Sequence, residues 1–177
     1  RANTESVESA DRMVENNLLQ LAEYYKKAGE KSNRIEDWTQ ASKDYAQFLG
    51  LFPESKYAYI VNFNYAQILD LNLNKLETAI EQYSEVIKRN KKGEVVEEAA
   101  LGILFCYEKL MIQRGIKEDT KGKIKVVKLS ESEMKKREEE IPRTPLHELE
   151  QGFVDAADTY VSLLQDLLTD PEVRKKN

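Results

Sequence analysis

One histidine is the residue of this chain best suited to acid–base chemistry or metal binding. His147 is followed by Glu148 and Glu150, so its imidazole could act as a general base or bind a metal ion beside a carboxylate. The same position also fits the first turn of a helix, where acidic neighbours favour the helix dipole. The sequence has no second histidine and only one cysteine, too few for a tetrahedral metal site. We therefore interpret His147 as a structural residue and expect no metal site.

The single cysteine, Cys106, is the other side chain that could react. Being alone, it excludes a disulfide within the chain. It shares an apolar stripe with Ala99, Ile103 and Leu110, and no basic residue adjoins it in sequence to lower its pKa. We interpret it as a core residue. The sequence also lacks a glycine-rich phosphate loop, a nucleophile elbow, a zinc-protease motif and an EF-hand motif. We expect neither enzymatic activity nor a cofactor.

The composition favours a folded helical chain. Of the 177 residues, 41% are hydrophobic and 33% charged, with only 7 Gly and 4 Pro. The net charge is −5, with 27 basic and 32 acidic residues intermixed, so nucleic-acid binding is not expected. The longest uncharged run, residues 57–69, is too short and too polar to span a bilayer. Since the chain begins at Arg1 without an apolar signal region, we expect it to be a piece of a longer protein.

Apolar residues recur every three or four positions through most of the chain, which predicts amphipathic helices. We expect one domain over residues 1–177 with about six main helices. These helices form hairpins over residues 6–49, 55–89 and 94–168. Glycine and proline separate the helices, with Gly29 ending the first helix and Gly50 and Pro53 closing the first hairpin. The expected helices cover residues 6–28, 35–49, 55–71, 75–89, 94–113 and 146–168.

A highly charged insertion over residues 116–145 interrupts this pattern before the last helix. Residues 123–129 alternate like a short strand, and residues 130–140 could form a brief helix. A basic patch in the insertion could bind an acidic protein, lipid headgroups or nucleic acid, although a solvated loop is the simpler interpretation. The patch consists of Lys121, Lys123, Lys125 and Lys128. Residues 172–177 are expected to form a frayed tail.

The second helices of the three hairpins share one spacing. Each has a small residue, an aromatic residue four positions later and an apolar residue after three more. The triplets are Ala41–Tyr45–Phe48, Ala79–Tyr83–Val86 and Ala156–Tyr160–Leu163. The small residue allows a close approach to the partner helix, and the aromatic ring fills the groove to the next hairpin. The pattern therefore indicates repeated hairpin packing.

This spacing resembles the second helix of the tetratricopeptide repeat, which has Ala, an aromatic residue four positions on and Pro after the helix. Ala41, Tyr45 and Pro53 match best. The intervals of 38 and 77 residues between the three alanines depart from the usual period of about 34, which longer turns and the insertion would explain. The resemblance implies an all-α, right-handed solenoid of antiparallel hairpins that acts as a non-enzymatic protein-interaction scaffold.

Some segments also resemble large envelope-associated tetratricopeptide proteins of deltaproteobacteria, a group that includes components implicated in gliding-motility machinery. These segments are residues 52–59, 63–66 and 146–161, and the resemblance covers about residues 15–168. It implies a role in a bacterial envelope assembly, in the periplasm or at the cell envelope. A cytoplasmic adaptor is the alternative. The resemblance supplies no catalytic residue.

A protein or peptide partner is expected on the concave face, which the first helices of the hairpins line in such a stack. There the hairpin at 55–89 offers apolar anchors and orienting polar groups for an extended or helical peptide. The candidate residues are Tyr59, Phe63, Gln67 and Asp70. A different function stays open, that of an architectural spacer whose apolar ends pack against further repeats of a longer solenoid.

Overall fold

A computed structural model describes residues 2–117 and 145–169, and all regular structure in these ranges is helical. The prediction of an all-α chain is therefore confirmed for the described part. The elements are α1 (Ala2–Ser32), α2 (Ile35–Leu51), α3 (Ala58–Gln67), the π-helix η1 (Ile68–Asn72), α4 (Leu76–Arg89), α5 (Val96–Gln113) and α7 (Glu148–Thr169). The expected strand at 123–129, the helix at 130–140, the basic patch and the tail at 172–177 lie outside the described residues.

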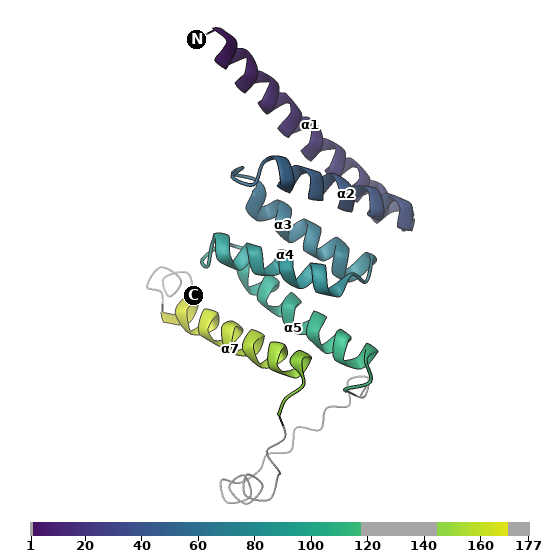
Figure 1. Cartoon of the computed structure of the whole chain (residues 1–177), viewed down its shortest axis with the longest axis vertical. Coiled ribbons are helices and arrows are strands. Elements are labelled where there is room, and N and C mark those ends of the chain that lie inside the picture. Colours follow the sequence, from purple (N-terminus) through teal and green to yellow (C-terminus); the bar gives the residue numbers. More distant parts are fainter. Residues whose placement is uncertain (1, 118–144, 170–177) are drawn as a thin grey trace, which may run out of the picture.

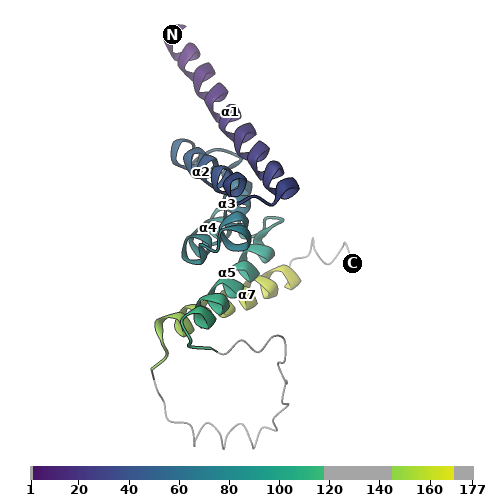
Figure 2. The same ribbon diagram turned by 90° about the vertical axis from the view of Figure 1, so that its right-hand side faces the viewer.

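Successive helices run in opposite directions and follow one another along the long axis of the molecule (Figure 1). Each helix from α1 to α5 packs against the next one in the chain, and α7 packs against α5. The view from the side shows the same stacking order (Figure 2). Because each helix is covered mainly by its neighbours in sequence, α1 and α7 each keep one side that no other described helix covers.

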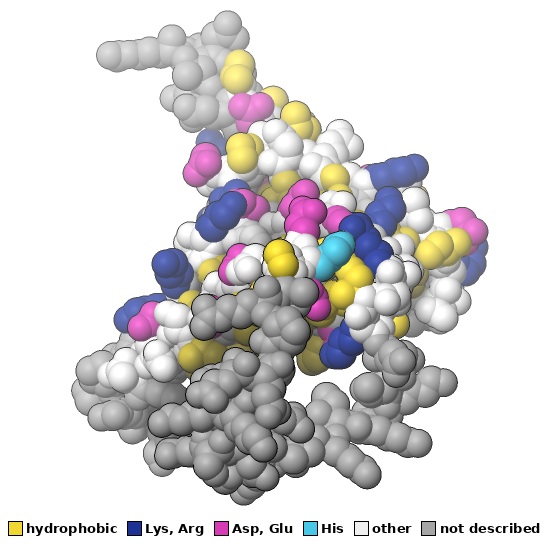
Figure 3. Space-filling model, turned by 60° about the horizontal axis from the view of Figure 1, so that its bottom comes forward, with side chains coloured by type: hydrophobic (Ala, Val, Ile, Leu, Met, Phe, Trp, Pro, Cys, Tyr) yellow, Lys and Arg dark blue, Asp and Glu magenta, His cyan; other side chains and the backbone are white. Residues whose placement is uncertain are grey.

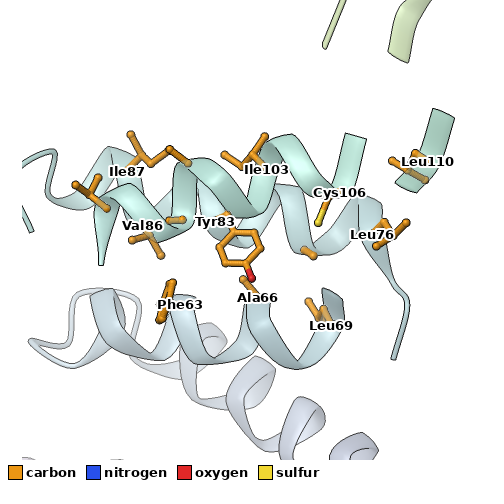
Figure 4. Close-up of a cluster of buried hydrophobic side chains, with 14 of the residues drawn as sticks. Phe63, Ala66, Leu69, Leu76, Tyr83, Val86, Ile87, Ile103, Cys106 and Leu110 are labelled. Atoms are coloured by element: carbon orange, nitrogen blue, oxygen red, sulfur yellow. The ribbon is translucent and has the colours of Figure 1, made fainter. Parts of the chain in front are cut away.

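Two hydrophobic clusters hold this stack together. The first joins α1, α2 and α3 around Ala22, Trp38, Tyr45 and Phe48, of which all but Trp38 are fully buried. The second and larger cluster joins α3, η1, α4, α5 and α7. In it, the ring of Tyr83 points from α4 toward α3 (Figure 4). The first two of the three predicted triplets lie wholly in these clusters, so their spacing encodes helix packing.

The last triplet is less deeply covered than the other two. Leu163 is 6% exposed, but Ala156 and Tyr160 are only partly buried. The physical reason is position, because α7 is the final described helix and no further helix packs on its outer side within residues 2–117 and 145–169.

The end of α1 differs from the prediction, because the helix continues past Gly29 to Ser32. Asn33, with φ of 53°, provides the reversal instead. Gly29 serves packing, since a Cβ there would lie 2.6 Å from the Trp38 ring. This glycine therefore allows α1 and α2 to approach closely.

The chain after α3 forms a π-helical turn, which sequence periodicity did not predict. The N–H of Leu73 donates to the carbonyl of Ile68 at 3.0 Å, closing an i to i+5 turn. Asn74 follows with φ of 51°, which lets the chain reverse into α4. The wider turn carries Asp70 into the buried side of the helix, where it is 6% exposed.

Candidate protein-interaction surfaces

Two of the four predicted binding residues on α3 and η1 are buried inside the protein. Phe63 is 8% exposed and Asp70 is 6% exposed. The Phe63 ring lies against Tyr83, with 6.0 Å between the ring centroids (Figure 4). The expectation that both side chains line an exposed groove is thereby corrected, because α4 and α5 cover the side of α3 from which they project.

The third residue, Tyr59, is engaged in a turn of the same chain. Its hydroxyl oxygen accepts a hydrogen bond from the N–H of Val95 at 3.1 Å. A Cβ on Gly93 would lie 2.0 Å from that oxygen, so only glycine fits beneath it. Burial is the main cause that raises the pKa of Tyr59. Tyr59 therefore fixes the turn before α5, and Gln67, which is partly exposed, is the fourth candidate that remains accessible.

Asp70 belongs to a buried polar cluster that joins η1 to α5. Lys109 Nζ donates to Asp70 Oδ1 at 2.5 Å, and the ammonium side of the pair reaches solvent. The buried Cys106 thiol lies beside this carboxylate, and burial, followed by the charge of Asp70, raises the Cys106 pKa to about 12. The thiol is therefore protonated at neutral pH and not nucleophilic. Removing the Lys109 charge would leave the buried Asp70 carboxylate unpaired, which destabilises a folded protein. The pair therefore contributes to the contact between η1 and α5.

Polar side chains link α3 and η1 to their second neighbours in the stack, α1 and α5. Lys26 Nζ on α1 donates to Asn64 Oδ1 on α3 at 3.4 Å. On the other side of α3, Gln113 Nε2 donates to Asn74 Oδ1 at 3.1 Å. This contact and the Asp70–Lys109 pair each join two residues that are 39 positions apart in the sequence. The same offset places Gln67 beside the turn of α5 that contains Phe105.

Phe105 on α5 is an exposed aromatic residue that the sequence analysis did not assign to binding. It is 54% exposed. The signal that could have identified it is its phase, because it falls outside the buried stripe formed by Ala99, Ile103, Cys106 and Leu110.

A groove lies on another side of the stack, between α4 and α7 and above α5. Its volume is about 310 Å³, at the lower end of the range for ligand pockets. Apolar side chains of all three helices line it, and polar side chains mark its edges. The residues that line the groove include Ile80, Lys88, Ile103, Tyr107, Asp155 and Thr159.

Gly152 on α7 shapes the floor of this groove. A Cβ at this position would lie 2.5 Å from the Tyr107 ring, so the glycine lets that ring lie close against α7. Burial is the first cause of a raised pKa for Tyr107, ahead of the nearby charge of Asp155. The neutral phenol therefore contributes a largely apolar surface to the groove.

His147 lies at the surface directly before α7 (Figure 3). Its imidazole Nδ1 accepts a hydrogen bond from the backbone N–H of Leu149 at 3.2 Å, and the backbone N–H of His147 donates to Glu150 Oε2 at 2.8 Å. Both bonds satisfy groups at the helix start, as in a capping arrangement. This geometry agrees with the interpretation of His147 as a structural residue at the start of the last helix.

Neither a metal cluster nor a membrane span is found in the part of the chain that the structure describes. No group of three or more His, Cys, Asp or Glu side chains there could hold a metal ion, and none of its helices is long and apolar enough to cross a bilayer. Comparison of the chain with protein-family models, with curated proteins and with solved structures gives no match. The surfaces described above are therefore the basis for a functional proposal.

Proposed function

We propose that this chain is a non-enzymatic scaffold of the tetratricopeptide type, and that it binds an amphipathic helix of a partner protein. Two observations support the repeat-like arrangement. Helices that alternate in direction are stacked in chain order, and the small–aromatic–apolar triplets recur at their contacts. A stack in which each hairpin touches only its neighbours is a rigid support for binding surfaces.

The observation that carries the proposal is the groove between α4, α5 and α7. Ile80 and Ile103 form an apolar lining, which can receive apolar side chains spaced along one face of a helix. The groove runs between two helices, so a third helix fits between them by the same side-chain packing that joins the helices of the stack.

Charged side chains on the two banks of the groove define the partner further. Lys88 lies on the α4 bank and Asp155 on the α7 bank. A partner helix with an apolar stripe and a basic flank toward α7 would complement Asp155, whereas the Lys88 charge is already paired with Glu85 at 2.6 Å. Such complementarity sets orientation and specificity more than affinity.

A substitution at the rim tests the groove. Thr159 is exposed, and its hydroxyl donates to the Asp155 carbonyl at 2.8 Å on the same helix. In Thr159→Trp, the indole would occupy the groove. A library of random-sequence 20-residue peptides is first selected against the unmodified protein, and binding is then measured by fluorescence anisotropy. We expect Thr159→Trp to weaken binding of the selected peptides at least about tenfold, which is about 1.4 kcal/mol.

Thr169→Trp is the matched control. Thr169 is also an exposed residue of α7, and its hydroxyl donates to the carbonyl four residues earlier at 2.8 Å, but it does not line the groove. This variant is expected to bind the peptides as the unmodified protein does. Equal affinity of the peptides for Thr159→Trp would contradict the proposed site, and selection of peptides without an apolar stripe would contradict the proposed partner class.

A further inference from the structure

The outer face of α1, at the end of the stack opposite α7, is apolar, and none of the helices in residues 2–117 and 145–169 covers it. The side of α1 toward α2 is filled, with Ala22 fully buried. Away from that contact, Leu21 is 42% and Tyr24 66% exposed, and Val14, which lies beside Leu51 and Phe52 at the end of α2, is 45% exposed. Val7 is also exposed, in the part of α1 that projects beyond the stack (Figures 1 and 2). A row of large apolar residues in water is unfavourable, which points to an interaction surface.

This face also lacks charge over its central part. The exposed residues between positions 13 and 24 are all uncharged, although 33% of the chain is charged. These residues are Met13, Val14, Asn16, Asn17, Gln20, Leu21 and Tyr24. The two carboxylates in the same stretch point inward, where Glu15 accepts a hydrogen bond from Ser55 and Glu23 accepts one from Tyr45. Depletion of charge together with exposed Met and Tyr is typical of the centre of a protein interface.

The spacing of the face is that of a coiled coil. Val7, Val14 and Leu21 are seven residues apart, and an equally spaced second row lies three positions further along the helix. The second row is Ala10, Asn17 and Tyr24. Two rows in this relation form the seam of a heptad repeat. α1 has 31 residues against 17 in α2, and of the seam residues Val14 borders the end of α2 at Leu51 and Phe52 while remaining 45% exposed.

We propose that the outer face of α1 pairs with the same face of a second copy of this chain, as an antiparallel two-helix contact. An uncharged face does not repel its own copy, and the amides of Asn16, Asn17 and Gln20 carry both donors and acceptors, so two identical surfaces can satisfy each other. A partner chosen by charge would need charges that this surface does not offer.

Residue size favours the antiparallel orientation. When the two-fold axis of an antiparallel pair passes between residues 15 and 16, Val7 of one copy lies opposite Tyr24 of the other, and Ala10 lies opposite Leu21. The smaller residue of the N-terminal half thus faces a large residue of the C-terminal half at these two levels, and Val14 faces Asn17, which is of similar size, between them. A parallel pair would instead set Ala10 against Ala10 and Tyr24 against Tyr24, which leaves a gap at one level and crowding at another.

Sedimentation velocity of the whole chain tests the pairing. The unmodified protein is expected to be a dimer in the micromolar range, and Val14→Glu with Leu21→Glu to raise the dissociation constant at least about tenfold, with helical circular dichroism retained. Val161→Glu is the matched control, because Val161 is a 50% exposed apolar residue on α7. A monomer at all concentrations up to about 100 µM would overturn the proposal, as would a dimer unaffected by the double substitution.

Disulfide trapping tests the orientation, and the buried Cys106 does not interfere. In the antiparallel register, the two residues at position 17 lie within about 5 Å along the axis, whereas those at position 10 are about 16 Å apart. We expect Asn17→Cys to give a covalent dimer under mild oxidation and Ala10→Cys to give none. Rapid cross-linking of Ala10→Cys would show a parallel pair and reject the antiparallel one. The groove between α4, α5 and α7 is separate, so peptide binding there is independent of this result.

Discussion

The contact between Gly102 and Tyr83 is a sensitive test of the packing between α4 and α5. A Cβ at Gly102 would lie 2.6 Å from Cε2 and Cζ of the Tyr83 ring. Favourable contacts between carbon atoms lie at about 3.5–4.0 Å, so in Gly102→Ala the ring must move by about 1 Å. Tyr83 is only 3% exposed and lies against Phe63, so little space is available for that movement.

Two opposing contributions set the size of the effect. Forcing an extra methyl group into a well-packed core costs about 1–3 kcal/mol. Replacing a helical glycine by alanine returns about 1 kcal/mol. Gly50→Ala is the matched control, because Gly50 lies in α2 and a Cβ there would meet nothing within 4 Å. We expect Gly102→Ala to be less stable than Gly50→Ala by about 1–3 kcal/mol, since both share the helical gain.

Urea unfolding followed by circular dichroism measures this difference directly. For a chain of this size, each kcal/mol corresponds to about 2–4 °C in the thermal midpoint. Tyr83→Leu removes the far ring atoms that the new Cβ would meet, so the Gly102→Ala penalty should shrink in the double variant. If Gly102→Ala proves as stable as Gly50→Ala, or if its penalty is unchanged by Tyr83→Leu, the packing argument fails.

Two further predictions concern buried titratable groups. Burial raises the pKa of Asp44 above 3.8, and its Oδ2 has no hydrogen-bond partner within the described residues. Burial penalises the charged form of Asp44 in the folded state. The contribution of Asp44 to the free energy of unfolding therefore falls as the pH rises from 3.8 through the raised pKa, and it stays low at higher pH. Asp44→Asn should therefore raise the thermal unfolding midpoint at pH 7 and reduce the loss of stability with rising pH. Asp158→Asn, at an exposed position, is the control and should change neither the midpoint nor its pH dependence. A midpoint lowered by Asp44→Asn would contradict the burial argument. The Cys106 thiol has a pKa of about 12 and no exposed surface, so it should react with a disulfide reagent only after denaturant is added. Fast labelling of the native protein would contradict the position of Cys106 in the core.

Helix positions and many core contacts were predictable because they depend on local periodicity. The triplet Ala41–Tyr45–Phe48 was predicted as packing and is fully buried. Cys106 was placed correctly in the core for the same reason, since it shares the stripe of Ala99 and Ile103. A period of three to four residues determines which side chains share one side of a helix, whatever lies opposite.

The binding residues were harder to predict, because sequence periodicity does not tell which of two partly apolar faces a neighbouring helix will cover. Phe63 and Asp70 are on the covered side of α3 and η1, whereas Phe105 is left exposed on α5. The π-helical turn that carries Asp70 toward Lys109 has no distinct pattern in sequence. The groove between α4, α5 and α7 is likewise a product of three segments far apart in the chain.

The sequence by itself determined that the described part of this chain is helical, where most of its helices lie and which side chains share one side of each helix, because these properties arise within one or two turns of a helix. Only the tertiary structure decided which surfaces stay open. The outer face of α1 shows the difference, since its heptad spacing is present in the sequence but its exposure depends on where α2 ends and on the inward direction of Glu15 and Glu23. Exposure is a property of the whole stack, and it decides where a partner can bind.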